Sequence, residues 1–176
     1  FSHSTFSLID KAYSQNTETN YFLKKLKVKK ITSIGNLKFI EHDNFETNQA
    51  DKKLFSQFRK YKTFVAASTH NTEELFAAKT HILLKKKIKN IITIIIPRHI
   101  NRVDQIISQI NELGLNAISR RSNKKKLDNI DIYLVDTFGE SKKFYKFATT
   151  VFLGGSIIKR GGQNPLEPAR FGAKIL

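Results

Sequence analysis

The feature that most constrains the fold is the run Ile-Ile-Thr-Ile-Ile-Ile at residues 91–96, which is β-branched at every position. An apolar run without polar alternation is typical of a strand that is covered on both faces. Strands of that kind occur in parallel sheets that carry helices on both sides. The run therefore predicts the centre of such a sheet.

Strand and helix patterns alternate on both sides of this run. Apolar residues recur at helical spacing from Val103 to Leu113, and Gly114 is suited to ending that helix. Such alternation forms βαβ units with right-handed crossovers and a parallel sheet, so we expect an α/β, doubly wound domain from about residue 61. Its other expected strands lie at 63–68, 117–118, 130–136, 149–155 and 173–176, with helices at about 72–87, 142–148 and 166–171.

The first third of the chain has a different pattern. Residues 10–27 predict a helix that ends in lysines, and residues 31–35 predict a short strand. Three parts are therefore expected. Residues 1–45 would be the remnant of a preceding domain, residues 46–60 a linker containing a short helix, and residues 61–176 an α/β domain truncated at its C-terminus. The absence of methionine suggests an internal fragment.

The net charge of +16 comes from 24 Lys and 7 Arg against 15 acidic residues. Enrichment of Lys together with Ile and Asn is typical of an A+T-rich coding sequence, so solvated lysine is the simpler interpretation. A basic face that attracts an anionic membrane surface or a phosphorylated substrate stays open. There is no apolar run of about 18–20 residues, as a membrane span requires. Cysteine is absent, which excludes disulfides and thiol chemistry.

Ligands bind at the carboxyl ends of the strands in sheets of this kind. Arg98 directly follows the run at 91–96, where its fork of donors would suit a phosphate or carboxylate, although a structural pairing is equally compatible. Gly139 would let the backbone approach a ligand, and Glu140 could accept a hydroxyl. A carboxylate at the start of a helix is, however, also common without any ligand.

The stretch 154–172 carries the strongest local signal. Two glycine pairs flank a basic loop, and Asn164 and Pro165 suit the N-cap and first position of a helix, whose N–H groups can bind phosphate. Glu167 in the first turn suits sugar hydroxyls. The spacing is neither that of a P-loop nor that of a dinucleotide motif, which disfavours ATPase and NAD chemistry. Secondary candidates in this stretch are Gly155, Ser156, Arg160, Gly161 and Gly162.

Ser68, Thr69 and His70 are further secondary candidates because they leave the strand at 63–68. His70 with Glu73 could form a metal or proton-transfer pair, but a lone histidine near a helix start is more often a hydrogen-bonded structural group. No second histidine lies at ligand spacing. We therefore expect no metal and no cofactor.

Four motifs follow one another along the chain: AASTHNTEE (66–74), IPRHINR (96–102), DTFGE (136–140) and GGSIIKRGGQNPLEPA (154–169). Their residues, order and spacing resemble those of the 3-deoxy-D-manno-octulosonic acid (Kdo) transferases. Residues 14–39 resemble the end of that family's N-terminal domain, so the resemblance covers essentially the whole chain.

The resemblance implies half of a glycosyltransferase B fold, in which two Rossmann-like domains face a cleft. It implies that the C-terminal domain holds CMP-Kdo, while the N-terminal domain supplies the acceptor site, the catalytic base and a membrane anchor. No catalytic residue is therefore expected in this chain, which alone should be inactive. The CMP-contact positions that the resemblance implies are Pro97, Arg98, Phe138, Gly139, Glu140, Asn164, Pro165, Leu166 and Glu167.

The function implied is transfer of Kdo from CMP-Kdo to a lipid A precursor, at the cytoplasmic face of the bacterial inner membrane. Gln163 departs from the family, because many members have histidine there. Two alternatives remain: a uridine-donor transferase of the same fold, and a basic module that binds nucleic acid or anionic lipid. The scarcity of arginine and the lack of an RNA-binding aromatic motif weigh against nucleic acid as a partner.

Overall fold

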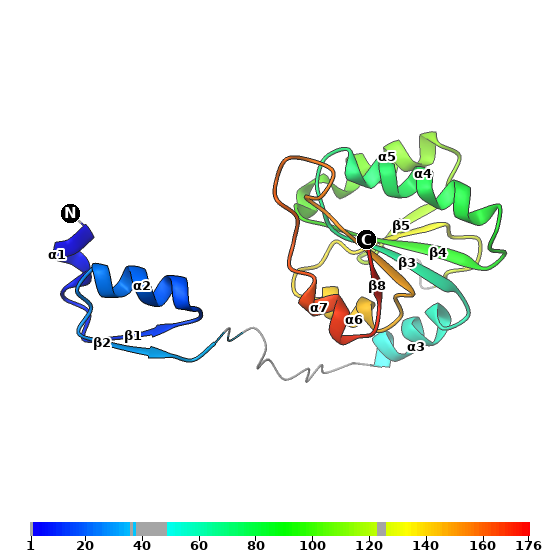
Figure 1. Cartoon of the computed structure of the whole chain (residues 1–176). Helices are drawn as coiled ribbons and strands as arrows, with labels where there is room; N and C mark the ends of the chain where they lie inside the picture. The colour runs from blue at the N-terminus through cyan, green and yellow to red at the C-terminus, as the bar shows by residue number, and fades with distance from the viewer. Residues whose placement is uncertain (1, 36, 38–48, 123–125) are drawn as a thin grey trace. The chain divides into compact units, whose positions relative to one another are not determined.

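The structure is a computed structural model that describes residues 2–35, 37, 49–122 and 126–176 (Figure 1). The chain divides into two compact units, Phe1–Asn44 and Phe45–Leu176.

The first unit is small and differs from the expected single helix at 10–27. Its elements are α1 (Ser2–Phe6), β1 (Lys11–Ser14), α2 (Thr17–Lys25) and β2 (Lys30–Ser33). The start of the expected helix is wrong because residues 11–14 pair in parallel with residues 30–33. The helix begins only after Asn16, whose side chain accepts a 2.7 Å hydrogen bond from the backbone N–H of Thr19.

The second unit contains a six-stranded sheet in the order β5-β6-β4-β3-β7-β8, and all its strand pairs are parallel. This confirms the predicted α/β, doubly wound fold. Its strands are β3 (Lys62–Thr69), β4 (Ile91–Pro97), β5 (Ala117–Ser119), β6 (Ile132–Leu134), β7 (Thr150–Leu153) and β8 (Lys174–Ile175). Its helices are α3 (Gln49–Phe58), α4 (Glu73–Lys85), η2 (Ile100–Arg102), α5 (Val103–Glu112), α6 (Ser141–Tyr145) and α7 (Leu166–Arg170).

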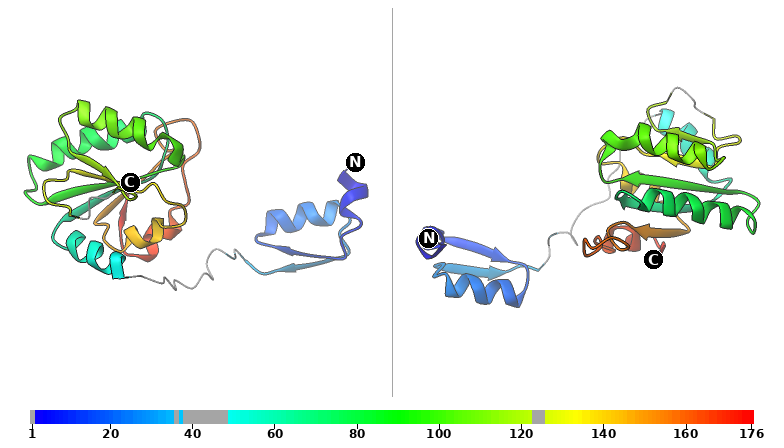
Figure 2. Two further views of the ribbon diagram at one scale, coloured as in Figure 1. Left: turned by 180° about the vertical axis from the view of Figure 1, so that it is seen from behind. Right: turned by 90° about the horizontal axis from the view of Figure 1, so that it is seen from above.

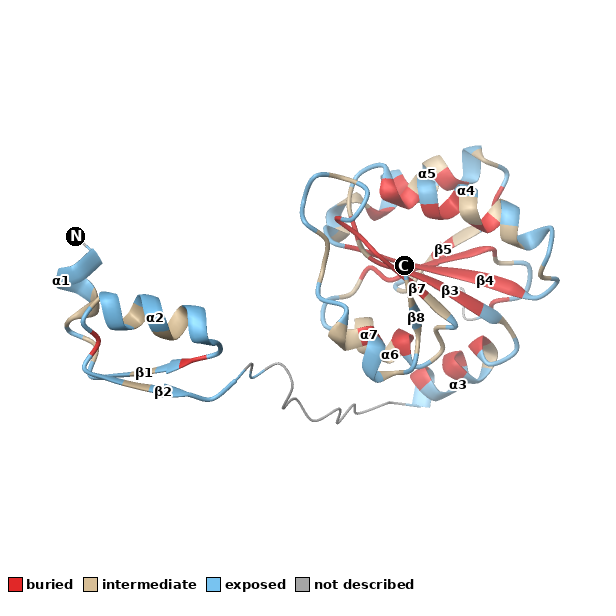
Figure 3. Cartoon of the chain, in the orientation of Figure 1, coloured by how far each residue is buried: buried red, intermediate tan, exposed pale blue. Residues whose placement is uncertain are grey.

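Helices cover both faces of this sheet, as Figures 1 and 2 show. On one face, α4 and α5 pack on Phe64, Ile95 and neighbouring residues. On the other, α3 and α6 pack on Val65, Ile94 and Ile96. Strand β4 is buried along its whole length (Figure 3), so the prediction from its β-branched run is confirmed.

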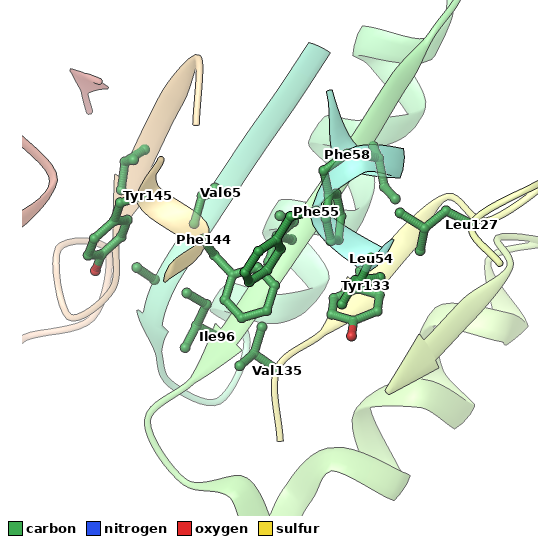
Figure 4. Close-up of a cluster of buried hydrophobic side chains, with 14 of the residues drawn as sticks. Leu54, Phe55, Phe58, Val65, Ile96, Leu127, Tyr133, Val135, Phe144 and Tyr145 are labelled. Atoms are coloured by element: carbon green, nitrogen blue, oxygen red, sulfur yellow. The ribbon is translucent and has the colours of Figure 1, made fainter. Parts of the chain in front are cut away.

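Helix α3 falls within the segment 46–60 that was expected to be a linker; residues 46–48 lie outside the described part of the chain. Its apolar side chains Leu54, Phe55 and Phe58 are buried in the core (Figure 4). The Phe55 and Phe58 rings both meet Phe144 of α6 edge-on, with centroids 5.9 and 6.0 Å apart. The helix is therefore part of the second unit.

Candidate functional site

The predicted site residues lie in loops at the carboxyl end of the sheet. From β3 the chain proceeds to β4 on one side, and it later reaches β7 on the other side of β3. Parallel sheets bind ligands at such a switch in strand order. The loops after β3, β4, β6 and β7 therefore surround the predicted crevice.

The backbones of the loops after β3 and β7 are in close contact. A Cβ atom at Gly154 would lie only 2.7 Å from the carbonyl carbon of Ser68 and from the Cα of Thr69. Ser68 has a φ of 55° at an irregularity in the β3 ladder, a conformation that is unusual for a residue other than glycine. Only glycine at position 154 permits this approach, which brings the two loops together at the switch point.

Hydrogen bonds to the Glu73 side chain connect these two loops. Its side chain is fully buried, and both carboxylate oxygens accept hydrogen bonds of 2.9 Å from the N–H of Gly155. The N–H groups of His70 and Ile157 donate to the same carboxylate, at 2.9 and 3.3 Å. The N–H groups of Gly155 and Ile157, which the glycine-rich sequence would offer to a phosphate, therefore already bind a carboxylate.

Arg98 stands at the end of β4, and its backbone N–H donates to the carbonyl of Thr69 at 2.9 Å. Its residue is exposed, and its guanidinium forms no hydrogen bond or ion pair within the described part of the chain. Pro97 before it is buried, while His99 after it is exposed and meets His70 edge-on, with ring centroids 6.0 Å apart. Arg98 could therefore bind an anion, because its guanidinium pairs with no carboxylate in the described part of the chain.

Arg102, in the same motif, has a structural role because its guanidinium is paired. Its guanidinium lies 3.1 Å from a carboxylate oxygen of Glu74, a side chain that is only 2% exposed. It also donates to the side-chain oxygen of Asn71 at 2.9 Å. The two arginines of the motif at 96–102 therefore have different surroundings, one paired and one open.

Glu140 is held in what we call the four-charge cluster, formed by Asp51, Arg120, Glu140 and Lys143. Arg120 donates through Nε and NH2 to the two oxygens of Glu140, at 3.1 and 3.2 Å. Lys143 lies 2.8 Å from Glu140 and 3.1 Å from Asp51, and Arg120 also pairs with Asp51. Thr137 donates its hydroxyl to Glu140.

Burial opposes the charge on Glu140, but the hydrogen bonds from Arg120, Lys143 and Thr137 prevail. Together with the positive charge of Arg120, they lower the pKa of Glu140 to about 2. The carboxylate is thus ionised at neutral pH. Phe138 and Gly139, which precede it, are exposed, and Phe138 is 78% accessible. Two predicted contact positions are therefore open to a ligand, whereas Glu140 already has protein partners.

The predicted helix at 166–171 forms as α7 (Leu166–Arg170), but its N-cap is Pro165 and not Asn164 as expected. Asn164 accepts a 3.0 Å hydrogen bond from the N–H of Leu166, and Pro165 occupies the N-cap position. Glu167 lies in the first turn, 41% exposed, with its carboxylate 3.9 Å from Lys142. Asn164 thus orders the start of a helix of five residues, and its predicted contact with a donor stays a prediction.

The glycine-rich loop encloses a shallow hollow of its own. The hollow measures about 440 Å³, and its lining includes Gly155, Ser156, Gly161 and Gly162. Ser156 donates its hydroxyl to the carbonyl of Leu153, and Gly162 N–H donates to Gly155 O at 2.8 Å. Arg160 is exposed and is not among the residues that line the hollow. The secondary candidates of this loop are therefore brought together.

Sequence reasoning missed three residues of this region. Glu73 connects two loops, and Asp51 and Arg120 belong to the four-charge cluster. Glu73 was considered only as a partner of His70, yet it binds a backbone group 82 positions away. Asp51 and Arg120 are 69 positions apart and belong to no motif. Nothing in the local sequence signals such contacts.

Neither a metal cluster nor a membrane-spanning helix is found where the structure is described. No group of three or more His, Cys, Asp or Glu residues there could hold an ion. No helix in those ranges combines the length and apolar character that crossing a bilayer needs.

Known proteins resemble this chain in both sequence and fold. A 3-deoxy-D-manno-octulosonic acid transferase of Rickettsia felis is 34% identical over 178 residues, which span 98% of this chain but 38% of the relative. That of Haemophilus influenzae is 30% identical over 148 residues, 84% of this chain and 35% of the relative. No protein-family model matches the chain.

Among solved structures, the C-terminal CMP-Kdo binding domain of WaaA from Acinetobacter baumannii resembles this chain with a TM-score of 0.65. The two are 26% identical, and the match covers 72% of this chain and 67% of that one. The resemblance to the Kdo transferases that the motifs predict is therefore confirmed over nearly the whole chain. The chain spans less than half the length of the curated relatives it matches.

Proposed function

We propose that this chain is the donor-binding part of a Kdo transferase, and that its second unit binds CMP-Kdo at the carboxyl end of the sheet. One observation carries the proposal. The chain shares fold and sequence with a solved domain described as binding CMP-Kdo, and its own motifs gather in the loops around the switch point.

In this proposal Arg98 binds the phosphate or carboxylate of the donor, because its guanidinium is exposed at the sheet edge and pairs with no described carboxylate. Phe138 and Gly139 offer an exposed ring and a backbone approach beside it. Binding of the leaving phosphate stabilises the charge that develops when the bond to the anomeric carbon breaks. No metal takes part in this arrangement.

The acceptor and the general base come from outside this chain in the same proposal. The complete enzyme would have a glycosyltransferase B fold and would transfer Kdo to a lipid A precursor at the cytoplasmic face of the inner membrane. An excess of lysine would favour a negatively charged membrane surface. The support for this part is the shared sequence with whole transferases of greater length.

Titration of CMP into the 176-residue chain by calorimetry tests the proposal. We expect saturable binding of CMP, weaker binding of UMP, and no transfer of Kdo by the chain alone. Equal affinity for UMP would favour a uridine-donor transferase of the same fold. A chain that binds neither nucleotide, but binds duplex DNA in physiological salt, would contradict the proposal and favour a nucleic-acid module.

A further inference from the structure

The four-charge cluster joins the predicted donor loop to a helix that no motif includes. Asp51 lies in the first turn of α3, Arg120 follows β5, and Glu140 and Lys143 flank the start of α6. Asp51 is 1% exposed, and the other three side chains are 15–18% exposed. Two cations and two carboxylates from three parts of the chain are thus gathered beneath one loop.

We propose that Asp51 and Arg120 are positioning residues of the donor site, which fix the Glu140 carboxylate in one orientation and thereby make α3 a working part of that site. This inference rests on the proposed function, in which the loop of Glu140 contacts the donor. Neither Asp51 nor Arg120 is assigned any contact with the donor itself. Their role is exerted through Glu140.

The geometry restricts Glu140 more than a single ion pair would. Arg120 contacts both of its carboxylate oxygens with two different nitrogens, an arrangement that fixes the plane of the carboxylate. Asp51 in turn binds both Arg120 and Lys143, so neither cation is free to follow Glu140 if that side chain turns. The carboxylate orientation is therefore set by a network, and Asp51 anchors it.

Aromatic packing also attaches α3 to the rest of the unit. Phe55 and Phe58 already pack edge-on against Phe144, and Phe58 also meets Tyr133 edge-on with ring centroids 5.2 Å apart. Replacing buried ion pairs by apolar side chains is often neutral or stabilising. A buried four-charge network beside an aromatic contact is therefore better explained by the position that it gives to Glu140.

The test compares CMP affinity in the full 176-residue chain and in an Arg120→Lys variant. Lysine keeps the charge but has no fork with which to hold both oxygens of Glu140. We expect the variant to fold with an unchanged circular dichroism spectrum and to bind CMP about tenfold more weakly, which corresponds to about 1.4 kcal/mol. If Arg120→Lys fails to fold, Asp51→Asn, which removes the anchor and keeps the shape, provides the same comparison.

A double-mutant cycle separates positioning from a general loss of structure. In a Glu140→Gln background, Arg120→Lys should change CMP affinity by less than about twofold, because the carboxylate that it positions is already gone. A tenfold loss of CMP affinity in both backgrounds would overturn the inference, because Arg120→Lys would then weaken binding without acting through Glu140. Unchanged affinity in a folded Arg120→Lys or Asp51→Asn variant would overturn it as well.

Asp131→Asn is the matched control. Asp131 immediately precedes β6, at the amino end of the strand and so at the opposite end of the sheet from the predicted site. There it pairs with Lys85 and contacts His81. This variant also disturbs a largely buried charge, yet it should leave CMP affinity unchanged. Failure of the unaltered chain to bind CMP contradicts the proposed function instead, so the two failures are distinguishable.

Discussion

At the scale of single residues, the two arginines that follow β4 differ in their surroundings. Arg98 is exposed, and no described carboxylate pairs with it, whereas Arg102 neutralises the buried Glu74. Sequence alone left Arg98 evenly balanced between these two roles. An exposed and unpaired guanidinium is what the proposed role in donor binding requires.

Arg98→Ala should therefore weaken CMP binding by about 1.5–3 kcal/mol, the usual cost of losing a hydrogen bond to a charged group. The melting temperature should stay close to that of the unaltered chain. Calorimetry and thermal melts check both quantities. Arg102→Ala is the control, because it strips a buried carboxylate of its cation and should lower the melting temperature. A similar loss of stability in Arg98→Ala would make Arg98 structural.

The lowered pKa of the buried His81 side chain leads us to expect that stability depends on pH. Burial lowers the pKa of His81 below 6.5, and Asp131 opposes this only in part. Nδ1 lies 2.9 Å from Thr93 Oγ1 and Nε2 lies 3.3 Å from Asp131 Oδ1, so the neutral ring has a partner at each nitrogen. Below pH about 6.5 the unfolded chain binds a proton that the folded chain resists, so stability must fall as pH falls.

Urea unfolding at about pH 7 and about pH 5 measures this dependence. The unfolding free energy of the unaltered chain should be lower at the more acidic pH. His81→Gln has no ring to titrate, so its free energy should change less over the same interval. An equal change in both proteins would show that other groups cause the dependence.

At the scale of elements, the predictable parts of the fold are those with a local signal. The run at 91–96 predicted β4 because each of its residues is β-branched, and the alternation of strand and helix patterns predicted a parallel sheet. Helix α3 could not be recognised as a core element, because its buried Leu54, Phe55 and Phe58 stand among charged and polar residues. Burial there depends on α6, which is distant in sequence.

The candidate site divides in the same way. Strand ends could be read from the sequence, and they placed Arg98 and Gly154 at the carboxyl end of the sheet, where the structure also has them. The partners of Glu140 and Glu73 could not, since hydrogen bonds between remote loops leave no periodic pattern. The shift of the N-cap of α7 from Asn164 to Pro165 reflects a local competition, in which the Asn164 side chain binds the N–H of Leu166.

Glu73 offers a prediction for the two loops that it joins. In Glu73→Gln an amide NH2 replaces one acceptor oxygen beside the N–H groups of His70, Gly155 and Ile157. We expect a loss of about 2 kcal/mol or more in unfolding free energy, because charge-assisted hydrogen bonds to a buried group are lost. Glu112→Gln, at the exposed end of α5, is the control and should change little. Equal stability of the two variants would contradict the fastening role.

At the scale of the whole molecule, the chain divides into the units Phe1–Asn44 and Phe45–Leu176. Every residue of the predicted donor site lies in the second unit. A protein made of residues 45–176 should therefore fold and bind CMP with the affinity of the whole chain. A tenfold or greater loss of affinity, about 1.4 kcal/mol, would show that the first unit contributes to the donor site.

The position of α3 has a practical consequence for producing the donor-binding unit. A protein cut at Tyr61, where the strand pattern begins, would lack Leu54, Phe55 and Phe58 and would bring their apolar contact surface into water. Exposed apolar patches of this kind promote self-association. Arg120 and Lys143 would also lose their shared carboxylate. Such a protein should elute from a sizing column as aggregates, whereas one that retains α3 should elute as a discrete species.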